Sequence, residues 1–176
     1  MSQNAILINR APVLTLWASV VAEQLGFDHK EALTLAKAVT GLTAQSKGRR
    51  LGIFKPVPKE MKKARARKRG EIFQVQILGR SVPCINTADG LRALNKDAAI
   101  EPKSVEKYLE GKFANALRPV RDTMRELAKS FKPEDLADNA FSLYVQFRPV
   151  VSENATGWGA KGELRLERIR SLQTGK

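Results

Sequence analysis

Cysteine and histidine are almost absent from this chain of 176 residues, which contains one of each, Cys84 and His29. A single cysteine excludes a disulfide bond within the chain. A structural zinc site needs four such ligands, so these two residues do not supply one. The chain also lacks the spacing of a phosphate-binding loop or a dinucleotide-binding fingerprint. The sequence therefore indicates a reducing compartment, and we expect neither a metal nor a cofactor.

Long hydrophobic runs are also missing. The apolar stretch at residues 11–22 is too short to span a bilayer. It has the length of a signal-peptide core, but only Arg10 precedes it as a positive charge, and its helical spacing continues past Ala22. We therefore expect a cytoplasmic protein with no membrane partner, associated with the nucleoid if the source is bacterial.

The sequence contains few arrangements of residues that are typical of active sites. His29 has no nucleophile near it in the sequence, and Cys84 follows a proline in an apolar stretch, as a buried filler does. Asp89, Glu101 and Lys103 could form the acidic and basic groups of a metal-dependent nuclease, but such spacing arises easily by chance in a highly charged chain. We expect no catalytic residue and no enzyme, and keep the nuclease as an alternative.

Positive charge, by contrast, is abundant and unevenly distributed. The chain has 31 Lys and Arg against 18 Asp and Glu, a formal net charge of +13 and a pI near 10.2. Residues 47–70, here called the basic segment, contain eleven basic residues and one acid, Glu60, and so carry +10 of that charge. The other residues hold 20 bases and 17 acids. The protein is a nearly balanced globule with one concentrated basic stretch, which attracts polyanions.

Such a segment is typical of nucleic-acid binding, because affinity comes chiefly from phosphate contacts and the counterions they release. Arginine binds phosphate through two hydrogen bonds and can also probe a groove. We predict a double-stranded DNA-binding regulator or architectural protein. Alternatives are an RNA-binding or ribosome-associated protein, a module that binds an acidic protein, a solvated linker, and a membrane surface or other polyanion. The predicted binding residues are Lys47, Arg49, Arg50, Lys55, Lys59, Lys62, Lys63, Arg65, Arg67, Lys68, Arg69 and Arg80.

Residues 1–46 read as an N-terminal helical pair. Apolar residues at spacings of three and four predict a helix over 11–25 with one apolar face, ended by Gly26. Asp28 and Glu31 have the spacing of a capping box at the start of a second helix. Residues 35–43 suggest a helix-turn-helix with its turn at Gly41, although the spacing of alanine and glycine does not match that motif. The alternative is an ordinary helix that contains Gly41.

Residues 72–85 predict a β-hairpin, because β-branched and aromatic residues alternate with glutamine. We expect its turn at 79–81 with Arg80 at the tip, and a return strand placed at a sheet edge by Pro83. The hairpin serves either as a DNA-contacting wing or as a structural cover. Thr87 predicts the cap of a short helix over about 88–95.

The remainder is predicted to be helical. One stripe of apolar residues covers 104–131, where Pro119 should kink or split the helix, and a further helix covers 133–147. The segment 163–172 could form a last helix or strand. We expect a mainly α (α+β) fold in which the basic segment links the helical pair to a bundle-like body at 71–176, unless the whole chain is one compact domain. Helices after residue 104 are candidates for a homodimer contact.

Overall fold

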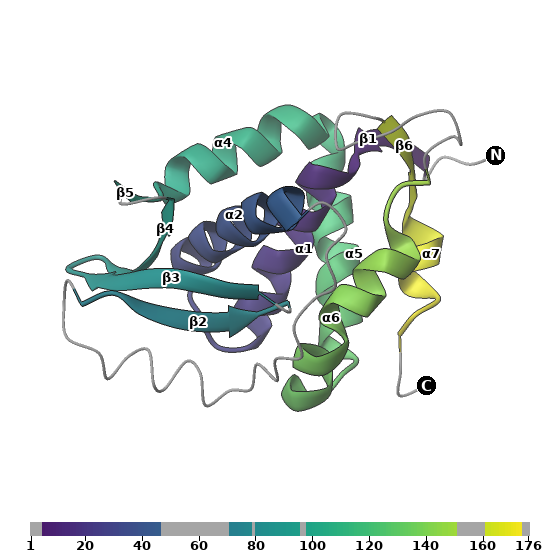
Figure 1. Ribbon diagram of the computed structural model, residues 1–176. Coiled ribbons are helices and arrows are strands. Elements are labelled where there is room, and N and C mark those ends of the chain that lie inside the picture. Colours follow the sequence, from purple (N-terminus) through teal and green to yellow (C-terminus); the bar gives the residue numbers. More distant parts are fainter. Residues whose placement is uncertain (1–4, 47–70, 79, 96–97, 151–160, 174–176) are drawn as a thin grey trace.

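The computed structural model describes residues 5–46, 71–78, 80–95, 98–150 and 161–173 (Figure 1). Within these residues the fold is mainly helical with two small antiparallel sheets, as the sequence predicts. The elements are β1 (Ala5–Asn9), α1 (Arg10–Gln24), α2 (His29–Ser46), β2 (Phe73–Ile77), β3 (Arg80–Thr87), β4 (Gly90–Asn95), β5 (Ala98–Ala99), α4 (Pro102–Phe113), the 3-10 helix η1 (Ala114–Ala116), α5 (Leu117–Lys129), α6 (Pro133–Phe147), β6 (Lys161–Arg165) and α7 (Leu166–Arg170).

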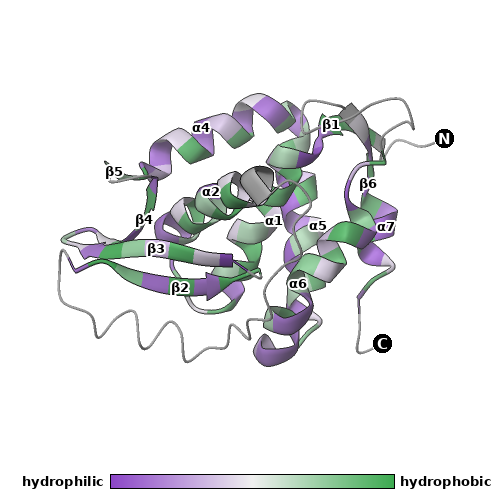
Figure 2. Cartoon of the chain, in the orientation of Figure 1, coloured by the Kyte–Doolittle hydropathy of each residue, from purple (hydrophilic) through white to green (hydrophobic). Residues whose placement is uncertain are grey.

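Helix α1 forms the centre of the molecule. Every residue from Pro12 to Ala22 is buried, so the helix is enclosed on all sides and does not present the single apolar face that the sequence suggested. The indole Nε1 of Trp17 donates a hydrogen bond to the carbonyl oxygen of Ala140 in α6 at 2.8 Å, and the Trp17 ring meets Phe147 edge-on at 5.3 Å. Helices α2, α4, α5 and α6 lie around α1 (Figure 1). Figure 2 shows that α4 and α6 carry both hydrophobic and hydrophilic residues, as surface helices do.

The connection between α1 and α2 confirms the predicted start and stop signals. Gly26 adopts a φ of 116°, a conformation that glycine reaches without strain. The Asp28 carboxylate accepts a hydrogen bond from the Glu31 N–H at 2.8 Å, and the Glu31 carboxylate accepts one from the Asp28 N–H at 3.0 Å. This reciprocal pair is a capping box, and it fixes where α2 begins.

Helix α2 runs without interruption through Gly41, so the helix-turn-helix interpretation is wrong. Thr40 explains part of the continuity, because its hydroxyl bonds the Ala36 carbonyl oxygen at 3.1 Å and lies 2.6 Å from the Thr15 hydroxyl of α1. In a helix-turn-helix the backbone changes direction at the turn glycine. Here the buried contacts of Thr40 keep the backbone helical instead. Gly41 is an exposed residue inside an ordinary helix.

The larger sheet has the strand order β2-β3-β4-β5. Ile77 pairs with Arg80, so Arg80 and Ser81 already belong to β3 and not to the turn that was expected at 79–81. Strand β3 lies between β2 and β4, so its predicted edge position is also wrong. The pairing of β3 with β4 extends only to the pair Cys84↔Ala93 and does not include Pro83. Proline is therefore tolerated here, because no hydrogen bond to β4 needs the N–H that it lacks.

The helix predicted near 88–95 is wrong, because this stretch forms strand β4. Thr87 caps a tight turn and not a helix: its hydroxyl bonds the Gly90 carbonyl oxygen at 2.8 Å and accepts the Asp89 N–H at 3.1 Å. Gly90 has a φ of 114°, which explains the glycine at this position. Ala88 and Asp89 form the turn between β3 and β4, and the glycine that follows Asp89 in the sequence is the hairpin signal at this position.

The C-terminal half follows the predicted helices. The long helix is split, as expected, into α4 and α5, with η1 between them; Pro119 lies in the first turn of α5, where no helical N–H bond is lost. Helix α6 begins at Pro133 and ends before Pro149. The last segment forms both a strand, β6, and a helix, α7. Strand β1, which the sequence did not reveal, pairs antiparallel with β6.

The buried apolar residues form one cluster that runs from Ile8 in β1 to Ile169 in α7. The N-terminal helices and the body therefore share one core among the described residues. In that same part of the chain, no helix has both the length and the apolar character needed to cross a membrane.

Candidate nucleic-acid interface

Eleven of the twelve predicted binding residues belong to the basic segment and lie outside the described residues. The fold does fix where this segment is attached. It follows α2, which ends at Ser46, and precedes β2, which begins at Phe73. Strand β2 is the outermost strand of its sheet. Both attachment points therefore belong to elements that pack on the common core.

Arg80 is the one predicted binding residue that the structure describes. It opens β3 and is half-buried, and its Nε donates a hydrogen bond to the Thr43 hydroxyl of α2 at 3.3 Å. Burial lowers the pKa of the Arg80 guanidinium, because desolvation disfavours its charge. The side chain thus connects the start of β3 to the end of α2, close to where the basic segment begins, and it does not extend from the tip of the hairpin.

The hairpin β2–β3 has two different faces. Its inner face carries Phe73, Val75 and Val82, all buried. Its outer face carries Gln74, which is exposed, and beside it Gln76 and Ser81, which are half-buried. The alternation of side chains along a strand predicts that Gln74 and Gln76 share one face, but their contact with Ser81 depends on the pairing with β3.

These three polar side chains form a hydrogen-bonded array. The Gln76 amide Nε2 donates to the Ser81 hydroxyl at 3.1 Å, and that hydroxyl donates to Gln74 Oε1 at 2.9 Å. Gln76 Oε1 is shielded from solvent and has no hydrogen-bond partner among the described residues. The array therefore leaves one buried acceptor, Gln76 Oε1, without a hydrogen bond in the described ranges.

Helix α2 fixes the sheet through two buried side chains. Glu31 Oε2 accepts the N–H of Leu91 at 2.9 Å, and the Thr34 hydroxyl accepts the N–H of Ala93 at 3.0 Å. Both N–H groups belong to β4, and both side chains are fully shielded from solvent. The helix thereby satisfies backbone groups of β4 that β3 does not pair, and positions the hairpin that adjoins the basic segment.

A second charged cluster surrounds His29, which the sequence placed at the start of a helix. Its Nδ1 lies 2.7 Å from Glu23 and its Nε2 3.3 Å from Glu106, and Arg121 and Arg125 complete the cluster through bonds of 3.1 Å to Glu106 and 3.3 Å to Glu23. The hydrogen bond to Glu23 raises the pKa of His29, against the opposing effect of burial. The cluster joins α1, α2, α4 and α5.

A groove of about 540 Å³ opens beside this cluster and is lined by Asp89, Glu101 and Lys103 together with His29 and Glu106. The fold therefore brings together the residues of the nuclease alternative. Within the described ranges, however, no three carboxylate, imidazole or thiol groups converge in a way that could hold a metal ion. Cys84 is buried, and burial raises the pKa of its thiol, so it is not poised to act as a nucleophile.

Comparison with known proteins finds no matching family model, no similar curated protein and no similar solved structure.

Proposed function

We propose that this protein binds double-stranded DNA, with the basic segment gripping the phosphate backbone. The observation that carries the proposal is the concentration of +10 of the net charge of +13 in residues 47–70, inserted between two elements of a core whose own charges nearly balance. A charge of this size in one stretch is enough for many phosphate contacts. The segment is joined to α2 at one end and leads into β2, a strand of the β2–β3 hairpin, at the other.

The aromatic side chains favour a duplex over a single strand. Proteins that bind single strands stack bases on exposed aromatic rings. Among the described residues, three aromatic side chains are half-buried (Tyr108, Phe131 and Phe141) and the other six are buried. A platform of exposed rings is thus missing from this part of the chain, whereas charge suited to a phosphate backbone is plentiful. The described residues therefore favour a duplex over a single strand, and the proposal names duplex DNA.

The test is fluorescence anisotropy with labelled duplex DNA, single-stranded DNA and duplex RNA across a salt series. We expect duplex DNA to bind best, with affinity that falls steeply as salt rises. In a segment variant, six bases are changed to glutamine: Lys62, Lys63, Arg65, Arg67, Lys68 and Arg69. Each lost phosphate contact should reduce the slope of log affinity against log salt by about 0.9.

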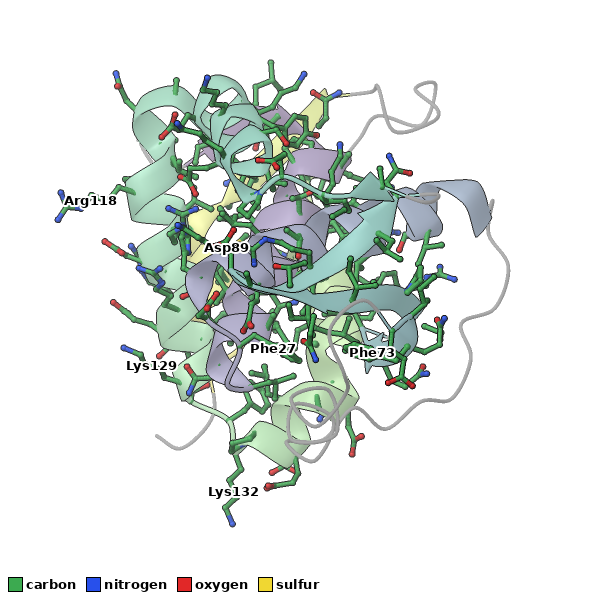
Figure 3. All side chains as sticks on the ribbon, turned by 90° about the vertical axis from the view of Figure 1, so that its left-hand side faces the viewer. Phe27, Phe73, Asp89, Arg118, Lys129 and Lys132 are labelled. Carbon is green, nitrogen blue, oxygen red and sulfur yellow. The ribbon has the colours of Figure 1, made fainter. Side chains whose placement is uncertain are left out.

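A matched control removes the same charge elsewhere. It changes six exposed bases to glutamine: Lys103, Lys107, Arg118, Lys129, Lys132 and Arg170. Three of them, Arg118, Lys129 and Lys132, extend away from the body of the protein in Figure 3. If the control variant loses as much slope as the segment variant, net charge and not the segment drives binding.

The same experiment separates the alternatives. Preference for duplex RNA would point to an RNA-binding protein. If the wild-type protein binds none of the three nucleic acids at low salt, the proposal fails, and an acidic protein partner becomes the next candidate.

A further inference from the structure

Two arginines, Arg10 and Arg148, lie where the start of α1 contacts the end of α6. Arg10 is the first residue of α1, and Arg148 directly follows the last residue of α6. The Arg10 Nε donates a hydrogen bond to the Pro149 carbonyl oxygen at 3.0 Å, and the Tyr144 hydroxyl donates one to the Arg10 carbonyl oxygen at 3.3 Å. The N–H of Arg148 bonds the Tyr144 carbonyl oxygen at 2.7 Å. These bonds fix both arginines around the same contact between two helices.

The positive charges of these two arginines have no negative partner among the described residues, where no carboxylate forms an ion pair with either guanidinium. Glu163 pairs with Val150, the residue after Pro149, but its carboxylate is bonded to Arg165 at 2.7 Å. Burial lowers the pKa of the Arg10 guanidinium, and the positive charge of Arg148 lowers it further. An anion between the two guanidinium groups would remove this repulsion.

The chemistry of the pair suits a phosphate group. Arg10 uses its Nε for the bond to Pro149, which leaves the N–H groups of its two terminal nitrogens for a ligand. Both arginines are half-buried, so an anion can reach them from the solvent. Guanidinium groups match the oxygens of a phosphate and bind them through charge-assisted hydrogen bonds. The first turn of α1 contains no acid and the Asn9 side chain does not cap it, so the positive end of the helix dipole adds to the same field.

The pair lies at the end of the molecule where the basic segment begins. Helices α1 and α2 are joined by a short connection and run antiparallel, and the hydroxyls of Thr15 and Thr40 lie 2.6 Å apart between them. Arg10 precedes Thr15 by five residues and Ser46 follows Thr40 by six, which places them about 7.5 and 9 Å beyond that contact in the same direction. Figure 1 shows the start of α1 and the end of α2 on the same side of the molecule. The basic segment follows Ser46 directly.

We propose that Arg10 and Arg148 together bind one phosphate group of the DNA backbone, beside the point where the basic segment begins. The basic segment supplies further phosphate contacts, and the two arginines supply one that is fixed to the core of the protein. A contact of this kind sets the position of the protein on the duplex without reading its sequence. The inference rests on the proposed function, since it requires that the protein binds duplex DNA.

The test measures the affinity of the full-length protein for labelled duplex DNA across a salt series. Arg148→Gln should weaken binding at low salt by about tenfold, because a charge-assisted hydrogen bond is lost. The double variant Arg10→Gln/Arg148→Gln should reduce the slope of log affinity against log salt by about 0.9, the value for one phosphate. A reduction of about 1.8 would mean two separate phosphates and would overturn the shared site.

A matched control removes two exposed positive charges from α5 in the variant Arg118→Gln/Lys129→Gln. We expect its slope to equal that of the wild type, and a loss as large as in the double variant would show that net charge alone is responsible. Arg10→Gln also removes the bond to Pro149, so thermal melting checks that each variant is folded. Arg148→Gln provides the test that does not depend on this bond.

Inorganic phosphate without DNA, added at constant ionic strength, separates a DNA phosphate from a free one. Suppose that phosphate raises the melting temperature of the wild type and not of the double variant, while the affinity and salt slope of the double variant for duplex DNA stay unchanged. The site then takes a free phosphate compound, and the proposed DNA contact is wrong. Unchanged duplex binding without any effect of phosphate overturns the site altogether and leaves the proposed function standing. If the wild type binds no duplex, the proposed function fails and the DNA contact with it.

Discussion

Glu31 Oε2 accepts a hydrogen bond from the backbone N–H of Leu91 at 2.9 Å, although the two residues are 60 positions apart in the sequence. Glu31 therefore acts twice, since its other carboxylate oxygen completes the capping box with Asp28. One side chain sets where α2 begins and also holds β4 against it. Thr34, one helical turn later, repeats the contact with Ala93. The position of the sheet relative to α2 thus depends on two side chains of one helix.

Thr34→Val tests this attachment. Valine has nearly the same shape but no acceptor, so the buried N–H of Ala93 would lose its partner, at a cost of about 1–3 kcal/mol of unfolding free energy. Urea denaturation at neutral pH measures the change. Thr123→Val is the control, because the Thr123 hydroxyl bonds only the Pro119 carbonyl oxygen of its own helix. We expect the smaller loss for the control, and equal losses would contradict a special role for the contact between α2 and β4.

Gly41→Ala should stabilise the protein. Gly41 lies inside α2, and a Cβ added there meets no atom within 4 Å. Alanine is favoured over glycine in a helix interior by about 1 kcal/mol, so the melting temperature should rise. Gly90→Ala should instead destabilise the protein, since Gly90 has a φ of 114° and a Cβ would lie 3.1 Å from Glu31 Oε2. A loss of stability in Gly41→Ala would contradict a helical, open environment at this position.

A helix or strand can be predicted from the sequence when residues close to one another in the chain determine it, and not when distant residues do. The capping box at Asp28 and the split of the long helix were predictable, because residues a few positions apart determine them. Strand β1 was not, since its partner β6 lies more than 150 residues later. The helical spacing of Leu91 and Leu94 predicts a helix in place of β4, whereas the turn at Ala88 and Asp89 and the contacts to α2 impose an extended backbone.

The candidate interface also has one part that the sequence reveals and one part that depends on the fold. Charge is a property of composition, so the basic segment is visible in the sequence without any knowledge of the fold. The array of Gln74, Gln76 and Ser81 depends on the register of β2 with β3, in which Ile77 pairs with Arg80 and Gln76 with Ser81. A shift of one residue in that register would move Ser81 away from Gln76. For that reason the array could not be derived before the pairing was known.

His29 gives a prediction for pH dependence. The hydrogen bond to Glu23 raises the pKa of His29 above its usual 6.5, so the folded protein binds the proton more tightly than the unfolded chain does. The stabilisation is therefore complete below about pH 6.5 and is lost as pH rises through the folded pKa. Because His29 is the only histidine, its NMR titration is unambiguous.

We expect the titration midpoint of His29 to lie above 6.5 in the wild type and to fall in Glu23→Gln. His29→Gln should reduce the unfolding free energy more at pH 6 than at pH 8.5, as measured by urea denaturation. Lys129→Gln, on an exposed face of α5 outside the cluster, should leave the midpoint unchanged. A midpoint at or below 6.5 in the wild type would show that burial outweighs the two carboxylates.

Arg80 has a structural contact with Thr43 and a predicted phosphate contact, and two substitutions separate the two. Thr43→Val removes the hydroxyl that Arg80 Nε bonds at 3.3 Å but keeps the guanidinium charge. Arg80→Gln removes the charge as well. Both should lower the unfolding free energy by about 1 kcal/mol, since each breaks a part-buried hydrogen bond. Only Arg80→Gln should reduce the slope of log affinity against log salt for duplex DNA, by about 0.9 for one phosphate. An unchanged slope in Arg80→Gln would assign Arg80 to the fold alone, because a phosphate contact without a salt effect contradicts counterion release.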